Sequence, residues 1–219
     1  MMRTKLASEF LGTATLVAVV VGSGTMATNL SRDLGLALVI NTISTILALG
    51  ILIFLLGPLS GAHFNPAVTL SELYLKRISA SESLMYIASQ ILGGITGAIV
   101  ANLMFSNPAI YLSENIRCGA NLYLAEIIAT AGLMAIIIMA RDQGKESFTP
   151  LLVASWIGSA YFFTSSTSFA NPAVTIARAF SDTFSGIAAQ SVPKFILSQL
   201  LGAAIGTLLA TYVLTTRRK

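Results

Sequence analysis

Residues 60–69 read SGAHFNPAVT and residues 168–175 read SFANPAVT, so the tripeptide Asn-Pro-Ala recurs at matched places in the two halves of this 219-residue chain. The two tripeptides consist of Asn65, Pro66, Ala67, Asn171, Pro172 and Ala173. Asn is a favoured N-cap, and Pro suits the first helical position because its missing N–H would have no partner there. Each copy therefore predicts a helix start inside a long hydrophobic stretch. Because broken backbone within a membrane is tolerated only where protein or a water-filled cavity surrounds it, two such starts indicate a pore.

The composition predicts an all-α membrane protein. Hydrophobic residues make up 55% of the chain and charged residues 10%, whereas a soluble domain usually carries about 25% charged residues. Five stretches without Asp, Glu, Lys or Arg are long enough to cross an apolar layer of about 30 Å as helices, and a sixth, shorter stretch extends if Glu126 and its neighbours are included. The six predicted membrane helices cover residues 6–28, 35–56, 82–105, 121–141, 148–165 and 192–214. Two half-helices are predicted over residues 65–76 and 171–182.

The positive charges lie in the predicted loops and at the termini, where they would set the topology. With six spans and both termini on one side, nine of the 13 basic residues lie on that side and four on the other. This bias predicts that both termini are cytoplasmic, and the short termini favour a bacterial inner membrane as the plasma membrane concerned. The net charge of +4 therefore does not indicate nucleic acid as a partner.

Cys118 is the only cysteine, so no intramolecular disulfide is possible.

The two halves repeat three landmarks in the same order: a glutamate, the tripeptide and a glutamine. Glu9 and Glu126 are 117 residues apart, the two asparagines 106, and Gln90 and Gln199 109. Each half holds three spans, an odd number, so the second half must enter the membrane in the reverse orientation. We therefore expect one domain over residues 1–219, built as an inverted repeat of residues 1–105 and 121–219 with a connecting loop between them.

Each half also contains Gly-x-x-x-Gly, formed by Gly93 and Gly97 in the first half and by Gly202 and Gly206 in the second. Small residues one turn apart let helices approach closely, and both pairs are interpreted as packing sites. The alternative is that they widen a solute path.

A third Asn-Pro-Ala, at residues 107–109, lies in the predicted connecting loop without a repeat partner and is interpreted as a turn.

These motifs together resemble the aquaporin, or major intrinsic protein, family over essentially the whole chain, and bacterial members of it in particular. The resemblance rests on residues 60–69, the second tripeptide, both glutamates and both Gln-x-x-Gly segments. It implies six spans and two half-helices that meet at the membrane centre, usually in a homotetramer with one pore in each subunit.

The two asparagines are the central candidates for contact with solute. Half-helix N-termini that meet from opposite sides would each present about half an elementary positive charge. Asn65 and Asn171 would cap these ends with their side-chain oxygens and leave their NH₂ groups free to donate to a passing water. The converging positive ends would disfavour cations and protons. In the alternative interpretation, both asparagines are helix caps only.

The remaining polar candidates are Glu9, Glu126, Gln90, Gln199 and His63. An ionisable residue inside a membrane is by default functional or part of a network, so the glutamates could couple protons in a transporter. We favour the role that the resemblance implies, in which they accept hydrogen bonds from the broken backbone before each half-helix, with the glutamines bridging nearby. The only histidine is expected to be packed beside its loop, with a pH-responsive gate as the alternative.

The chain departs from the resembled family directly after the second tripeptide, where Val174 replaces the usual Arg. Counting from the motifs places the outer filter at Thr45, Ser159, Ser168 and Val174, with Ser44 or Gly158 as alternatives for the first two. Arg178 lies one turn further along and is not expected to replace the missing Arg. A ring of small, uncharged side chains predicts a wide filter, because pore diameter and lining groups set selectivity.

These observations favour a passive channel for water and small neutral solutes such as glycerol, urea and undissociated arsenous acid. The glycerol-conducting branch usually has Asp after the Arg, whereas this chain has Thr175. A strictly water-selective channel is the first alternative. A coupled secondary transporter would need ion-binding carboxylates where the helices break, and a structural junction protein would not need duplicated helix caps. The sequence shows no enzyme constellation, metal cluster or cofactor-binding motif.

Overall fold

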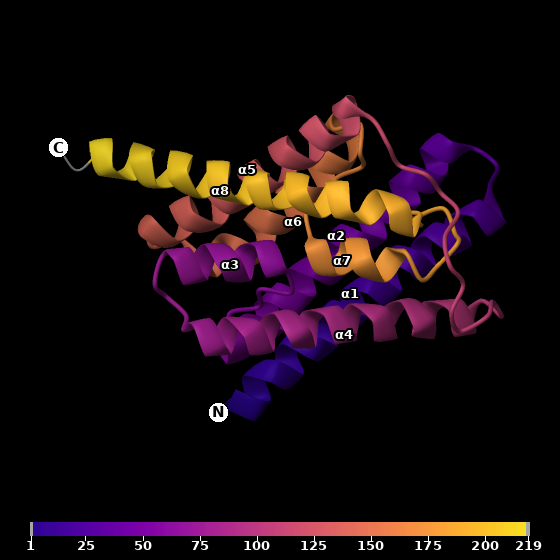
Figure 1. The fold of residues 1–219 in the computed structure, drawn as a ribbon, viewed down its shortest axis with the longest axis horizontal. Coiled ribbons are helices and arrows are strands. Elements are labelled where there is room, and N and C mark those ends of the chain that lie inside the picture. The colour runs from indigo at the N-terminus through magenta and orange to yellow at the C-terminus, as the bar shows by residue number, and fades with distance from the viewer. Residues whose placement is uncertain (1, 218–219) are drawn as a thin grey trace.

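The computed structural model describes residues 2–217, which fold into helices joined by turns and loops, without a strand. The long helices are α1 (Met2–Leu30), α2 (Leu34–Ser60), α4 (Ala80–Met104), α5 (Ala120–Asp142), α6 (Thr149–Phe163) and α8 (Val192–Arg217). The short helices are α3 (Pro66–Tyr74) and α7 (Pro172–Arg178), with single 3-10 turns η1 (Glu146–Phe148) and η2 (Ala189–Ser191). Figure 1 shows them as one helical bundle.

The predicted all-α membrane architecture is confirmed, with helices at all six predicted spans and at both predicted half-helices. Within residues 2–217, five helices are long and apolar enough to cross a membrane. The sixth, α6, has 15 residues, which corresponds to about 22 Å of helix. Helix α7 ends at Arg178 rather than at residue 182, because the chain beyond it turns to pair with the connecting segment.

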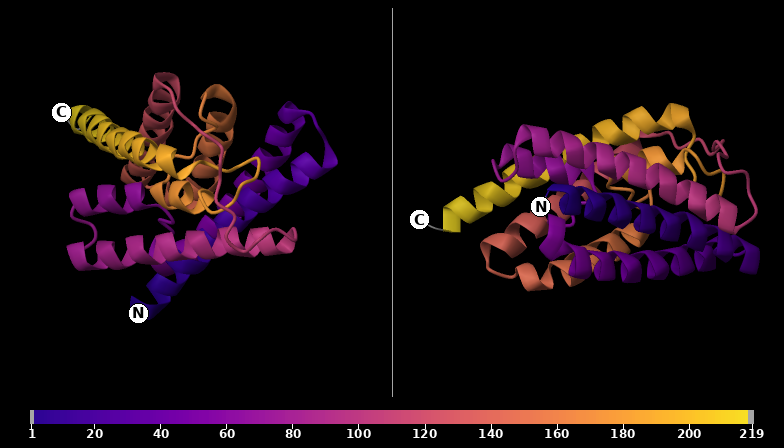
Figure 2. Two further views of the ribbon diagram at one scale, coloured as in Figure 1. Left: turned by 45° about the vertical axis from the view of Figure 1, so that its right-hand side comes forward. Right: turned by 90° about the horizontal axis from the view of Figure 1, so that it is seen from below.

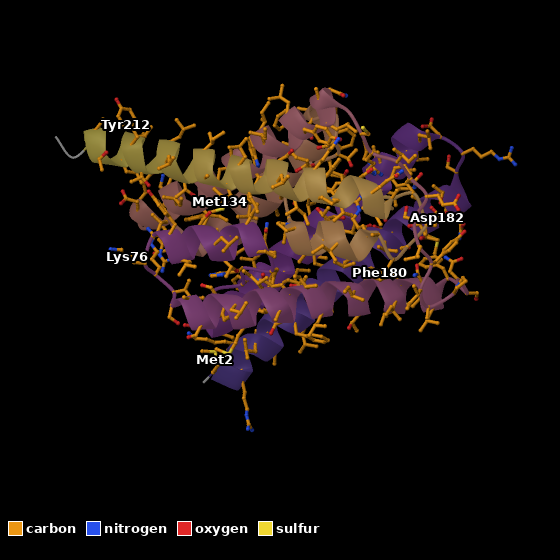
Figure 3. The ribbon with its side chains drawn as sticks, in the orientation of Figure 1. Met2, Lys76, Met134, Phe180, Asp182 and Tyr212 are labelled. Carbon is orange, nitrogen blue, oxygen red and sulfur yellow. The ribbon has the colours of Figure 1, made fainter. Side chains whose placement is uncertain are left out.

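The two halves follow the same succession of two long helices, a half-helix and a third long helix. The half-helices α3 and α7 lie end to end between α4 and α8 (Figure 1). Lys76, just beyond α3, lies at one end of the bundle, and Phe180 and Asp182, beyond α7, lie at the other (Figure 3). The half-helices therefore begin near the centre and run toward opposite ends.

Close helix packing accounts for the repeated Gly-x-x-x-Gly. Helix α4 packs along α1, and α8 packs along α5 (Figure 2). A Cβ atom on Gly93 or Gly97 would lie 2.3 or 2.1 Å from a carbonyl oxygen of α1. A Cβ atom on Gly202 or Gly206 would lie 2.4 or 2.1 Å from a carbonyl oxygen of α5. Only glycine allows these backbones to approach so closely.

The segment that connects the halves covers the end of the bundle away from both termini (Figure 1). Tyr111 N donates to Phe180 O at 3.2 Å, and Ser113 N donates to Ala179 O at 3.0 Å. The third Asn-Pro-Ala lies in this segment outside any helix, and Cys118 is exposed. The connecting segment is therefore bonded to the backbone that follows α7.

Replacing Gly97 by Ala is expected to destabilise the protein, because the new Cβ atom would overlap a backbone oxygen that moves only if α4 separates from α1. Overpacking of this kind typically costs about 1–3 kcal/mol. Gly57→Ala is the matched control, since nothing lies within 4 Å of a Cβ atom there. Thermal unfolding in detergent measures both. Equal melting temperatures for the two variants would contradict this account of the packing.

Candidate functional site

A cavity of about 280 Å³ extends along both half-helices and draws on α1, α2, α5 and α6 as well. At the α3 end, its lining includes the charged residues Lys5, Glu72, Arg77, Glu82 and Arg141. In the middle, its lining includes Phe64, Asn65, Ala170 and Asn171. At the α7 end, its lining includes Thr45, Ser168, Phe169, Val174 and Arg178. The lining thus joins residues from both ends of the bundle, as a transmembrane pathway requires.

Each asparagine caps its own half-helix and also bonds to the other repeat. Asn65 Oδ1 accepts from Ala67 N at 2.9 Å, and Asn171 Oδ1 accepts from Ala173 N at 3.0 Å. Asn65 Nδ2 donates to Ala170 O at 2.8 Å, and Asn171 Nδ2 donates to Phe64 O at 2.8 Å. The sequence predicts two free NH₂ groups, whereas here one N–H of each is already used. The second N–H of each amide remains for a solute in the cavity.

The backbone before each half-helix adopts matching unusual conformations. Ala62 and Phe64 have φ of 48° in the first repeat, and Ser168 and Ala170 have φ of 52° and 49° in the second. Residues with side chains rarely adopt this left-handed region, and they keep it only where the surroundings enforce it. The loops therefore need strong local restraints.

Glu9 restrains the first of these loops from α1. Its two carboxylate oxygens accept from His63 N at 3.0 Å and from Phe64 N at 2.7 Å. They also accept from Ser60 Oγ at 2.7 Å and Gln90 Nε2 at 2.8 Å. The carboxylate is fully buried, so these four donors replace the water it would otherwise need.

Glu126 restrains the second loop from α5 in the same way. It accepts from Phe169 N at 2.9 Å and from Ala170 N at 2.8 Å. Gln199 Nε2 donates to it at 2.7 Å and also to Thr175 Oγ1 at 2.8 Å. Gln90 contacts Thr69 in the first repeat at 3.0 Å. The sequence did not predict that Thr69 and Thr175 would bond to the glutamines, although the repeated Asn-Pro-Ala-Val-Thr contains both threonines.

His63 is packed as well as bonded. Its Nδ1 lies 3.0 Å from Thr69 Oγ1, and its ring meets the Tyr86 ring edge to face, with 5.2 Å between centroids. The Tyr86 hydroxyl donates to Ser60 O at 2.8 Å. The histidine also contributes to the cavity lining. Its position fits the expected packed residue beside the loop.

Three of the four residues predicted for the filter lie together at the cavity: Thr45, Ser168 and Val174. Ser159 does not, since it is exposed and its hydroxyl donates to Ser155 O at 2.9 Å. From the same helix, Ile157 and Tyr161 line the cavity instead, because residues four apart share one helix face. The alternative Gly158 faces Ile46 of α2.

Arg178 also lies at this end of the cavity, although the sequence gives it no part in the filter. Its side chain is buried, its Nε donates to Ser185 O, and its guanidinium carbon is 3.4 Å from the centroid of the Phe169 ring. Arg117 of the connecting segment lies over the same ring at 5.1 Å. Burial lowers the pKa of Arg117, an effect that the charge of Glu126 opposes. An arginine nevertheless stays protonated at neutral pH.

At the α3 end, the charges are paired. Glu72 accepts from Arg77 Nη1 at 3.0 Å and from Arg141 Nη1 at 2.9 Å, which links α3 to α5. Lys5 bonds to Glu82 at 2.7 Å. The sequence did not predict these ion pairs, since charged residues near helix ends carry no signal of such pairing.

Fold and site together define a class of membrane protein in which an inverted repeat brings two half-helices to one shared cavity. The family model for Major intrinsic protein matches residues 1–169. The chain therefore belongs to the major intrinsic protein family.

Known relatives agree with this membership, and a solved structure has a similar fold. The chain is 46% identical over 211 residues to "Aquaglyceroporin AqpS" of Rhizobium meliloti (strain 1021), covering 96% of this chain and 90% of the relative. It is 31% identical over 174 residues to "Probable glycerol uptake facilitator protein" of Thermotoga maritima, covering 69% of this chain and 71% of the relative. The fold is similar to the X-ray structure of the aquaglyceroporin from Plasmodium falciparum, with a TM-score of 0.73, 20% identity and coverage of 97% and 95%.

Glu126→Gln is expected to destabilise the protein and to reduce solute flux. The new amide would place a donor against backbone N–H groups of Phe169 and Ala170, and a buried unsatisfied donor costs about 1–3 kcal/mol. Glu114→Gln, at an exposed side chain, is the matched control. Melting temperature and flux per assembled protein measure the two effects. A Glu126→Gln protein as stable and active as the control would contradict the restraint of the loop by Glu126.

Proposed function

We propose that this protein is a passive transmembrane channel for water and small neutral solutes of the glycerol, urea and arsenous acid type. The observation that carries the proposal is the cavity along the two half-helices, with asparagine amides in its middle and Val174 at its α7 end. Valine is smaller than the arginine usual at this place and carries no charge. The opening beside it therefore suits solutes larger than water.

The chemistry of the middle of the cavity supports neutral solutes. Among the described lining residues, the charged side chains belong to the two ends, while the middle offers amide N–H groups and backbone. A neutral solute can exchange hydrogen bonds with water for hydrogen bonds with these donors. A bare ion would lose its hydration without a compensating charge.

The two carboxylates near the helix breaks do not favour a coupled transporter. Glu9 and Glu126 are fully buried, and their oxygens already accept from backbone N–H groups and from a glutamine. Neither carboxylate is among the residues that line the cavity. A coupling ion would have to displace bonds that hold the loops in place.

The names of the relatives support the same solute class, since one is an aquaglyceroporin and another a probable glycerol uptake facilitator. We further propose a multi-pass location in the bacterial inner membrane with both termini cytoplasmic, because the basic residues favour that side. Large hydrophobic side chains exposed along the long helices fit contact with lipid and with other subunits of a homotetramer. Residues 1–219 would then form one channel domain with its own pore.

Solute flux into proteoliposomes tests the proposal. Glycerol, urea, arsenous acid and water are each expected to equilibrate faster than in protein-free vesicles, and collapsing a proton or sodium gradient should leave the rates unchanged. Stopped-flow light scattering gives the rates for water, glycerol and urea. The arsenic content of the vesicles over time gives the rate for arsenous acid. Uphill accumulation driven by either gradient would reject a passive channel. Water flux alone would favour the strictly water-selective alternative.

Val174→Arg is expected to lower the ratio of glycerol to water permeability. Arginine adds bulk, a permanent charge and several donors at the cavity wall. A barrier increase of ~1.4 kcal/mol for glycerol alone would lower the ratio about tenfold. Val174→Thr, of similar size and without charge, is the matched control and should keep the ratio. If both variants keep the ratio of the unsubstituted protein, Val174 does not limit solute size.

A further inference from the structure

Arg178 has hydrogen-bonding capacity that the protein does not use. Its Nε donates to Ser185 O and its guanidinium covers the Phe169 ring, while within residues 2–217 its two Nη atoms have no hydrogen-bond acceptor. The residue is only 3% exposed, yet it lines the cavity. A buried guanidinium with spare donors beside a cavity is positioned to donate to what the cavity holds.

The charge of Arg178 has no acidic partner among the described residues, where the ion pairs involve other side chains. The guanidinium of Arg117 lies over the same Phe169 ring and has the same sign. An unpaired charged side chain inside a membrane protein usually faces a water-filled cavity, because the free energy of burying the charge in an apolar interior is too high. Arg178 therefore marks the α7 end of the cavity as a hydrated, positive region.

The internal repeat gives independent support for this placement. Arg178 follows Asn171 by as many residues as Glu72 follows Asn65, so the two positions are equivalent in the repeat. Glu72 lines the cavity at the opposite end. Both half-helices thus direct this position toward the pathway. Val174 lies on the same face as Arg178, and four residues of helix separate them by about 6 Å along the axis.

A second polar group at this end also has no partner. The Ser168 hydroxyl is buried and unbonded within the described residues, and Ser168 lines the cavity together with Arg178. A solute oxygen at this level could accept from the guanidinium while its hydroxyl meets the serine. Val174 supplies the apolar wall beside them.

We propose that Arg178 is the specificity-determining residue of the channel entrance: its charge excludes cations, and its Nη groups bind the oxygens of neutral hydroxylated solutes. The inference rests on the proposed channel function. Val174 leaves the opening wide, and the positive charge comes from Arg178, whose backbone lies about one turn further along α7. The channel thereby combines a wide opening with a barrier to cations, since lining charge and diameter act on selectivity separately.

The test is the leak of sodium ions through proteoliposomes that contain the full chain, measured together with glycerol uptake on the same vesicles. Arg178→Gln is expected to raise the sodium leak about tenfold, which corresponds to ~1.4 kcal/mol of barrier. Glycerol uptake should slow, because the oxygen-binding donors are fewer. Adding Val174→Arg to Arg178→Gln is expected to lower the sodium leak again, since it returns a charge to the same face of α7.

Arg117→Gln is the matched control, because it removes an equal charge from beside the same ring. The Arg117 Nε and Nη2 atoms donate to Gly186 O and Phe184 O, and the residue is not among those that line the cavity. Its sodium leak should stay close to that of the unsubstituted channel. A leak in Arg178→Gln no larger than that in Arg117→Gln overturns the proposal.

Arg178→Lys provides a second test in case the Arg178→Gln protein does not assemble. Lysine keeps the charge, so an assembled Arg178→Lys channel should still exclude sodium, and a tenfold leak there would overturn the proposal. Failure of the proposed function is a separate outcome, recognised by the absence of neutral-solute flux in the unsubstituted protein. A channel that passes glycerol but gains no leak in Arg178→Gln refutes only the role of Arg178.

Discussion

The interrupted helices depend on two buried carboxylates. Four backbone N–H groups before the half-helices, those of His63, Phe64, Phe169 and Ala170, donate to Glu9 and Glu126. Without these acceptors the N–H groups would be unsatisfied in an interior that lacks water, which is why broken backbone is rare in membranes. The same bonds hold the left-handed residues of each loop. The cavity exists because these loops stay open rather than continuing as helix.

The two repeats are coupled at the centre by the asparagines. Each side chain caps its own half-helix and donates to the loop of the other repeat, so Asn65 bonds to Ala170 and Asn171 bonds to Phe64. These acceptor residues are also those whose N–H groups bond to the glutamates. A single residue therefore connects each glutamate to the asparagine of the opposite repeat. The centre of the pathway is one network, to which both halves contribute equally.

The sequence predicted the helix starts well, because Asn and Pro decide capping locally and the repeat supplies a second copy. It did not predict the face of α6 that meets the cavity: Ser159 is exposed, whereas Ile157 and Tyr161 line the pathway. The lipid-facing side of a membrane helix is as apolar as its packed side, so periodicity gives little information on register. Counting from the second tripeptide predicted that Val174 would lie at the filter, and Val174 does line the cavity. The same count assigned no role to Arg178, because it does not show that a long side chain can reach the cavity from one turn further along the helix.

The charged side chains are paired at the α3 end of the cavity, whereas the arginine at the α7 end has no acidic partner among the described residues. At the α3 end, Glu72 is neutralised by Arg77 and Arg141, so two guanidiniums surround one carboxylate. At the α7 end, the equivalent position of the repeat is itself an arginine without an acidic partner among the described residues. Both ends are thus positive on balance, while the middle between them offers neutral amide and backbone groups. In the proposed channel a cation would meet repulsion at either end, whereas a neutral solute would be attracted by hydrogen bonds. With the proposed role of Arg178, charge at the ends would select against cations, and hydrogen bonding in the middle would select among neutral solutes.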